Sequence, residues 1–307
     1  MKVASAAYPL DWHDNWLSFE EKIEAWVAGA AEAGADLLVF PEYAAMELSS
    51  LAGFDIASDP IESLIAVSEV MPESIALLQR FATRYEVHIS APTGPVERLD
   101  GKLVNRAHLL APSGSKGYQD KLIPTPSERR GLNISAGEQT AVFETSIGKI
   151  GILICYDCEF PLIARGMIEA GAEILLVPSC TEAVAGFWRV RVGAMARALE
   201  GQCVVAHAPL VGRADWCNAA ERATGSAAIY CPSDHGFSET GILDEGPLGL
   251  AGWALADVEL SDIALVRRNG HVLNMEHWGE QHSPLNRIHT VALSDGVALD
   301  ALASSMG

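Results

Sequence analysis

The chain has 307 residues, of which 49% are hydrophobic and 20% are charged. This length and apolar content supply the core of one large domain or two ordinary ones, and they exclude a disordered chain. Forty Asp and Glu residues against 21 Lys and Arg give a formal net charge of −19. Because such an acidic surface repels phosphate backbones and anionic lipids, we expect neither a nucleic acid nor a membrane as a partner.

The chain shows no targeting or membrane pattern. Its first residues turn polar too early for a secretory signal, and no run of 18 apolar residues is present. The six cysteines all lie in the second half, at positions 155, 158, 180, 203, 217 and 231. They are too sparse for a disulfide scaffold, so we expect reduced thiols in a cytoplasmic protein.

Helical and strand patterns alternate along the chain. An apolar helical stripe at residues 23–31 stops at Gly34 and is followed by a buried strand at 37–40. The region 216–252 is rich in Gly, Pro and Asp and is predicted to be mostly loop. Further helices are predicted at 73–85, 161–169 and 187–200, and further strands at 87–91, 103–111, 150–154, 174–177 and 203–206.

One internal similarity bears on the fold. Residues 32–41 (EAGADLLVFP) parallel residues 169–178 (EAGAEILLVP), each a helix end, a glycine and a buried strand that ends in proline. The match fits either a coincidence within a common αβ unit or an α/β fold of two related halves. No Pro/Gly/Ser linker divides the halves, so we predict a single domain over 1–290. The tail 291–307 is predicted to pack on this domain or on a neighbouring subunit.

Cys155 is the first candidate for chemistry. It follows an apolar strand and precedes a helix that starts at Pro161, so a sharp turn would point its thiol into the crevice at the carboxyl end of the sheet. Backbone N–H groups of that turn can lower the pKa of a thiol and bind an oxyanion. Taken alone, Cys155 also fits a buried core cysteine, and with Cys158 it forms a C-x-x-C pair typical of redox or zinc sites.

Three further residues carry little information singly. Glu42 lies just past a buried strand and could serve as a general base, Lys121 could supply fixed positive charge, and Glu128 lies seven residues beyond it. Each also fits a solvated surface side chain. Together they are more informative, because they belong to three motifs that follow one another along the chain. These motifs are Phe-Pro-Glu at 40–42, Asp-Lys-Leu-Ile-Pro at 120–124 and Ile-Cys-Tyr-Asp at 154–157.

With these three motifs the sequence resembles the nitrilase superfamily of carbon–nitrogen hydrolases. The resemblance extends from the first strand to at least Trp253. It implies a four-layer αββα sandwich of two pseudo-symmetric halves, and a catalytic triad of Glu42, Lys121 and Cys155. A second glutamate, which orients substrate and lysine, is best matched by Glu128 and less well by Glu138.

The turn Cys-Tyr-Asp-Cys-Glu-Phe-Pro resembles a branch of the superfamily whose members are sometimes fused to an acetyltransferase domain, which we do not expect in these 307 residues. In that branch the second cysteine, Cys158, is expected to be structural. The resemblance further implies no metal or organic cofactor and a homodimer, or a multiple of it, formed through the helices after the nucleophile.

The implied reaction is hydrolysis of a small-molecule amide through a Cys155 thioester. Glu42 serves as base and acid, while Lys121 and the Tyr156 N–H hold the oxyanion. A nitrile or a carbamoyl amine could replace the amide, and an amine could replace water as acyl acceptor. Pocket residues that could contact the substrate follow a predicted strand end, namely Thr181, Glu182 and Trp188.

Two readings of other classes remain. Four histidines near the end of the chain could suggest a zinc hydrolase, but they lack the spacing of a zincin or of a structural zinc site. A catalytically silent family member that only binds its ligand would also fit the sequence. The intact triad argues against it, because buried charges that serve no reaction cost stability.

Overall fold

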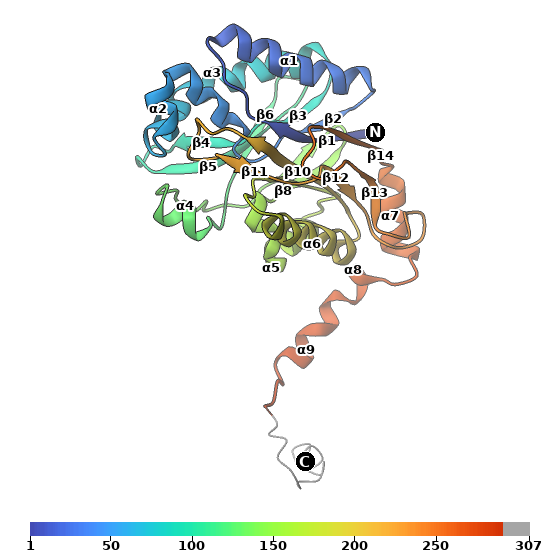
Figure 1. Ribbon diagram of the computed structural model, residues 1–307. Helices are drawn as coiled ribbons and strands as arrows, with labels where there is room; N and C mark the ends of the chain where they lie inside the picture. The colour runs from blue at the N-terminus through green and yellow to red at the C-terminus, as the bar shows by residue number, and fades with distance from the viewer. Residues whose placement is uncertain (291–307) are drawn as a thin grey trace, which may run out of the picture.

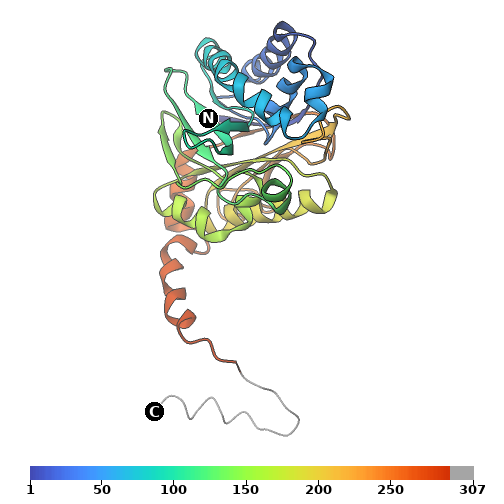
Figure 2. The same ribbon diagram turned by 90° about the vertical axis from the view of Figure 1, so that its left-hand side faces the viewer.

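The computed structural model describes residues 1–290, which form two β-sheets packed between two layers of helices (Figures 1 and 2). Helices α1 (Trp16–Glu32) and α3 (Glu62–Arg84) cover one outer face. Helices α5 (Pro161–Glu169) and α6 (Val184–Gly201) cover the opposite face. The αββα sandwich that the sequence predicts is confirmed. The tail 291–307, predicted to pack on the domain or on a neighbour, lies outside the described residues.

The first sheet has the strand order β4-β5-β3-β2-β1, with β6 paired to β5 and β14 paired to β1. Parallel pairing joins β1, β2 and β3, while β5 runs antiparallel to β3, β4 and β6. The strands are β1 (Lys2–Pro9), β2 (Leu37–Val39), β3 (His88–Ser90), β4 (Gly94–Glu97), β5 (Leu103–Leu110), β6 (Lys116–Asp120) and β14 (Gly252–Asp257).

The second sheet has the order β10-β9-β8-β7, with β11 and β12 paired to β10 and β13 paired to β12. Its strands are β7 (Val142–Thr145), β8 (Gly148–Ile152), β9 (Ile174–Ser179), β10 (Val204–Arg213), β11 (Arg222–Ala223), β12 (Ala228–Tyr230) and β13 (Ile242–Glu245). The region 216–252 thus contains three short strands within the loops that the sequence predicts.

The pleat of β2 explains the four layers. Leu38 and Phe40 point to the core under α1 and α3, whereas Leu37 and Val39 join the core between the two sheets. Both faces of this central strand are therefore apolar, which accounts for its unbroken hydrophobic run.

The two related segments occupy equivalent places in the two sheets. Each helix, α1 or α5, ends before a glycine with a positive φ, 84° at Gly34 and 101° at Gly171, and a parallel strand follows. The sheets meet where the end of β1 pairs with β10, at Tyr8–Leu210 and Pro9–Val211. This seam brings the carboxyl ends of β2 and β8 towards each other.

Helix α3 differs from the prediction, because it starts at Glu62 rather than near residue 73 and continues through Pro72. Proline removes one backbone hydrogen bond of a helix and usually ends it. Here the buried stripe Leu64, Val67, Met71, Ile75 and Leu78 runs across the proline, so burial of apolar surface outweighs the lost bond.

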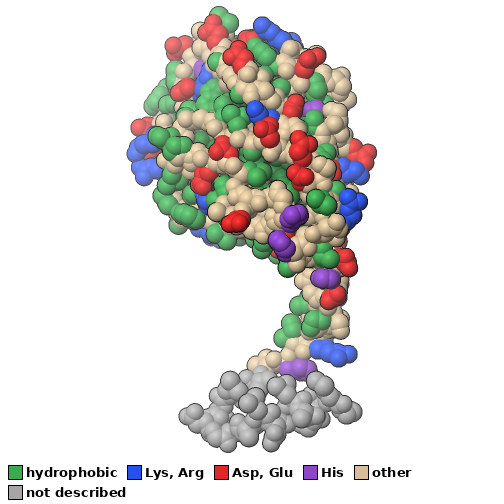
Figure 3. Space-filling model, turned by 90° about the vertical axis from the view of Figure 1, so that its right-hand side faces the viewer, with side chains coloured by type: hydrophobic (Ala, Val, Ile, Leu, Met, Phe, Trp, Pro, Cys, Tyr) green, Lys and Arg blue, Asp and Glu red, His purple; other side chains and the backbone are tan. Residues whose placement is uncertain are grey.

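The remaining elements are short or lie at the edge of the sandwich. They are η1 (Ala44–Ala52), α2 (Phe54–Ser58), α4 (Pro126–Arg130), η2 (Cys155–Glu159), α7 (Leu260–Asn269), α8 (Asn274–His277), η3 (Trp278–Gln281) and α9 (His282–Leu285). After α7 the chain leaves the body as a narrow arm (Figures 2 and 3). The guanidinium of Arg165 holds the base of this arm, 3.9 Å from the ring centroid of Trp278.

Candidate active site

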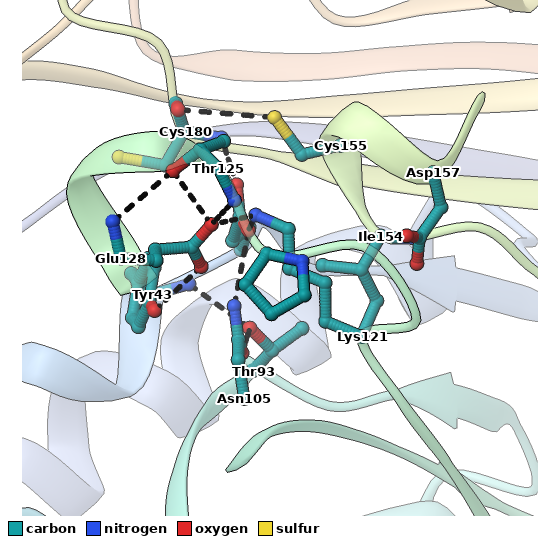
Figure 4. Close-up of polar contacts among 12 residues, drawn as sticks. Tyr43, Thr93, Asn105, Lys121, Thr125, Glu128, Ile154, Cys155, Asp157 and Cys180 are labelled. Atoms are coloured by element: carbon teal, nitrogen blue, oxygen red, sulfur yellow. Dashed lines mark hydrogen bonds and ion pairs between the residues drawn. The ribbon is translucent and has the colours of Figure 1, made fainter. Parts of the chain in front are cut away.

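Four of the predicted site residues meet beneath the surface at the seam between the sheets (Figure 4). Glu42 follows β2, Lys121 follows β6, Cys155 follows β8, and Glu128 lies in α4. Strand ends position three of these side chains, so their geometry is set by the two sheets. The exposed fraction of each residue is only 1–4%.

The Lys121 ammonium lies between two carboxylates. Its Nζ is 2.7 Å from Glu42 Oε1 and 2.6 Å from Glu128 Oε2. Glu42 is held further by the side-chain amide of Asn105, which donates to Oε1 at 3.0 Å, and by the backbone N–H of Cys180, which donates to Oε2 at 2.8 Å. The carboxylate of Glu42 is therefore fixed by donors from both sheets.

Glu128 owes its place to a capping box. Thr125 begins α4 by accepting a hydrogen bond from the Glu128 N–H, and the Glu128 carboxylate in return accepts from the Thr125 backbone N–H and hydroxyl. The hydroxyl of Tyr43 donates to its other oxygen at 2.8 Å. Glu138, the less favoured match for this position, lies on the surface and pairs with Arg98.

The surroundings of the two glutamates shift their pKa values in opposite directions. Burial raises the pKa of Glu42 to about 7; the charge of Lys121 opposes this rise and that of Glu128 adds to it. Burial would also raise the pKa of Glu128, but Lys121 and the bonds from Thr125 and Tyr43 lower it overall. One lysine charge thus keeps Glu128 ionised and leaves Glu42 poised to exchange a proton near neutral pH.

Cys155 sits in an unusual backbone conformation at the start of η2. Its φ of 50° is left-handed, a conformation that costs a non-glycine residue about 1–3 kcal/mol and is typical of functional turns. Its Sγ lies 3.9 Å from the carbonyl oxygen of Cys180. Burial and the charge of Glu42 raise the pKa of the thiol above its usual range. The resting thiol is therefore protonated and needs a base. This is the opposite of the lowered pKa that backbone N–H groups of the turn could have given.

Three of the other predicted contacts lie apart from this cluster, whereas Tyr156 adjoins Cys155. The Thr181 hydroxyl donates to the carbonyl of Thr224, which ties the end of β9 to β11. Glu182 is exposed, and Trp188 is half exposed on the outer face of α6. Tyr156 follows Cys155 in η2 and packs its ring against Phe160. The geometry therefore gives Thr181, Glu182 and Trp188 no contact with the buried charges.

Cys158 lies beneath α6, away from Lys121. It is fully buried, and its Sγ is 3.6 Å from the carbonyl oxygen of Val190. This position fits the structural role expected for it.

Sequence reasoning missed Tyr43, Asn105, Thr125 and the Cys180 N–H. Only Thr125 carried a signal, because Thr-Pro-Ser-Glu at 125–128 has the spacing of a capping box. In residues 1–290 no three His, Cys, Asp or Glu side chains are grouped so as to hold a metal ion. Over the same residues, every helix is too short or too polar to cross a membrane.

Comparisons with known proteins show which family the chain resembles. The sequence model of the carbon–nitrogen hydrolase family matches residues 2–241. The probable hydrolase YhcX of Bacillus subtilis is 36% identical over 262 residues, which are 84% of this chain and 50% of YhcX, so the chain spans about half the length of that relative. A deaminated glutathione amidase of Synechocystis is 27% identical over 213 residues, which are 66% of this chain and 75% of the amidase.

The fold agrees with that of a solved structure. Nit3 of Saccharomyces cerevisiae, a member of the nitrilase superfamily, superposes with a TM-score of 0.68 at 19% identity, covering 87% of this chain and 93% of Nit3. The match of the family model to residues 2–241 shows that this chain belongs to the carbon–nitrogen hydrolase family.

Proposed function

We propose that the protein hydrolyses an amide of a small molecule to a carboxylic acid plus ammonia or an amine, through a thioester on Cys155. The observation that carries this proposal is the single lysine held between two buried carboxylates beside a strained, buried thiol. This arrangement provides a base, an acid, a fixed positive charge and a nucleophile within one dry site.

In the first half of the reaction, the Cys155 thiol gives its proton to Glu42 as the sulfur attacks the amide carbonyl carbon. The oxyanion is stabilised by the Lys121 ammonium and the Tyr156 N–H. The tetrahedral intermediate then collapses, the carbon–nitrogen bond breaks, and Glu42 gives its proton to the departing nitrogen. Ammonia or an amine leaves, and the acyl group remains on sulfur as a thioester.

In the second half, Glu42 removes a proton from water as the water oxygen attacks the thioester carbonyl. The second tetrahedral intermediate breaks its carbon–sulfur bond, the acid leaves, and the Glu42 proton returns to the Cys155 sulfur. One water is consumed and every catalytic group recovers its starting proton. A carboxyl with a pKa near 7 suits these alternating steps, because neither protonation state is costly at neutral pH.

Ammonia release from a panel of small amides tests this proposal. We expect turnover with kcat/KM falling about tenfold per pH unit below about pH 7, because protonated Glu42 cannot accept the thiol proton. Nitriles and carbamoyl amines in the same panel would identify the alternative substrates. Silence across the whole panel, with Cys155 still open to alkylation, would favour a family member that only binds its ligand.

We also propose a homodimer formed through α5 and α6. These helices expose large apolar side chains, with exposed fractions of 80% at Leu162, 61% at Val192 and 50% at Trp188. A second copy related by a two-fold axis would cover this apolar face with the same face of its own.

For the location we propose the cytoplasm, a reducing compartment in which the six unpaired cysteines would stay reduced.

Light scattering at micromolar concentration is expected to give a dimer or a multiple of it. The V192E variant should shift the protein to the monomer, because the new charge would be buried at the interface. Leu17→Glu, at an equally exposed site on α1, serves as the control and should leave the dimer intact. A single 32.7 kDa species for the unmodified protein would refute the dimer.

A further inference from the structure

A buried carboxylate that takes no part in the proposed chemistry lies beside the site. Asp157 is the third residue of η2 and is fully buried. Its carboxylate accepts three backbone hydrogen bonds, from the N–H of Leu122 at 3.1 Å, of Ile123 at 2.8 Å and of Ile154 at 3.3 Å. One side chain therefore satisfies three donors that burial removes from water.

The three backbone N–H groups that Asp157 accepts from belong to neighbours of Lys121 and Cys155. Leu122 and Ile123 directly follow Lys121, while Ile154 directly precedes Cys155. Lys121 comes from the first sheet by way of β6, and Cys155 comes from the second sheet by way of β8. Asp157 thus joins the backbone that carries the ammonium to the backbone that carries the thiol.

We propose that Asp157 is a positioning residue, which sets the distance between the Lys121 ammonium and the Cys155 sulfur and so controls both halves of the reaction. This inference rests on the proposed function. Lys121 and Cys155 belong to segments that are remote in the sequence and meet only at the seam, so their spacing depends on a link between them. A shift of about 1 Å in such a geometry can cost about 10²-fold in rate.

The ionised carboxylate is the form that fits this place. It offers lone pairs on both oxygens and no proton, so all three N–H groups find acceptors. Burial raises the pKa of Asp157 to about 6, and the three N–H bonds oppose that rise, so the side chain is mostly ionised above pH 7. Asparagine has nearly the same shape, but its NH₂ group would face at least one of these N–H donors.

Asp157→Asn is the direct test, and Asp234→Asn is its matched control. The side chain of Asp234 is 5% exposed and also accepts from three backbone N–H groups, those of His235, His271 and Val272, in a loop remote from the charge cluster. Its Oδ1 lies in addition 3.1 Å from the imidazole Nδ1 of His271. Both substitutions remove one carboxylate and disturb three backbone bonds. A purely structural role predicts similar losses of thermal stability and unchanged kcat in both variants.

We expect D157N to lower kcat about 10²-fold with KM within about threefold of wild type, while D234N keeps its kcat. Alkylation of Cys155 by iodoacetamide at pH 7.5 should also slow, by about tenfold, because the thiolate loses its alignment with Lys121. The direction of the change in the alkylation rate is informative. If D157N only removed the Asp157 charge and left Lys121 in place, it would favour the Cys155 thiolate and speed its alkylation. Unchanged or faster alkylation together with wild-type kcat would overturn the proposal.

A second variant covers the case in which D157N does not fold. Asp157→Glu keeps the charge and the acceptors but moves the carboxylate by one methylene, and we expect at least about a tenfold loss of kcat; a D157E enzyme with wild-type kcat would equally overturn the proposal. The alkylation assay separates this inference from the proposed function. If the wild-type protein hydrolyses no amide, the function fails, whereas the alkylation rates of the variants still test the positioning.

Discussion

Replacing Cys155 with serine is expected to abolish amide hydrolysis while the fold remains intact. The change is nearly isosteric, but a serine hydroxyl is far less acidic than a thiol, and Glu42 with a pKa of about 7 is too weak a base to activate it. We expect kcat to fall at least about 10³-fold. The measurement is ammonia release, with circular dichroism and thermal unfolding to show that the variant is folded.

Cys158→Ser provides the control, because this second thiol of the same turn lies under α6. It should cost about 1 kcal/mol in stability and leave the rate close to wild type. With limiting iodoacetamide, Cys155 should be labelled before Cys158, because Cys155 is slightly exposed and adjacent to Glu42 whereas Cys158 is fully sealed. A redox protein would lose function with either substitution and would form a 155–158 disulfide. Labelling of Cys158 first, or full activity of C155S, would show the mechanism to be wrong.

Lys121→Met is expected to cost both activity and stability. Methionine fills a similar volume but leaves Glu42 and Glu128 buried without their shared cation. Breaking a buried ion pair in this way typically destabilises a protein by about 3–5 kcal/mol. We expect a loss of this size in the free energy of unfolding at pH 7, together with undetectable hydrolysis.

The pH dependence of this loss gives a sharper test. Without Lys121, burial and mutual repulsion raise the pKa of both carboxyls in the folded state above their unfolded values. A carboxyl whose pKa is higher in the folded state takes up a proton on folding at pH values between its unfolded and its folded pKa. Its destabilising effect therefore grows as the pH rises from the unfolded pKa to the folded pKa, and it is smaller at lower pH. Urea unfolding should therefore show a smaller deficit for K121M at pH 5.5 than at pH 8.

Lys149→Met is the matched control, because Lys149 forms an exposed pair with Glu144. Exposed pairs contribute about 0–1 kcal/mol, so this variant should unfold nearly as wild type at every pH. An equal deficit for K121M at pH 5.5 and pH 8 would mean that the two carboxylates are not the cause of its instability.

The four layers and the charged centre were implied by the family resemblance that three ordered motifs carry. Periodic apolar residues and the glycine after each helix indicated two similar segments, and motif order pointed to Glu42, Lys121 and Cys155 as partners. These are local signals, so a single chain contains them. The preference for Glu128 over Glu138 likewise agrees with a capping box that four consecutive residues encode.

Asn105 and Tyr43 show what the sequence could not provide. Asn105 reaches Glu42 across 63 positions of the chain, from the middle of a strand that reads as ordinary alternation. Tyr43 contacts Glu128 across 85 positions. Its backbone is left-handed, a conformation that the sequence does not predict because neither glycine nor asparagine stands at this position. The course of α3 through Pro72 has the same cause, since tertiary burial decided against a local preference. Each depends on long-range packing.

The bond from the Cys180 N–H to Glu42 joins the ends of the two repeated units, since one follows Pro178 and the other follows Pro41. Catalytic competence is thus a property of the seam and belongs to neither repeat alone. The turnover rate should consequently depend on the relative position of the two sheets. In protein engineering, repacking of the core between the sheets would register first as altered catalysis, at substitutions too mild to change the melting temperature.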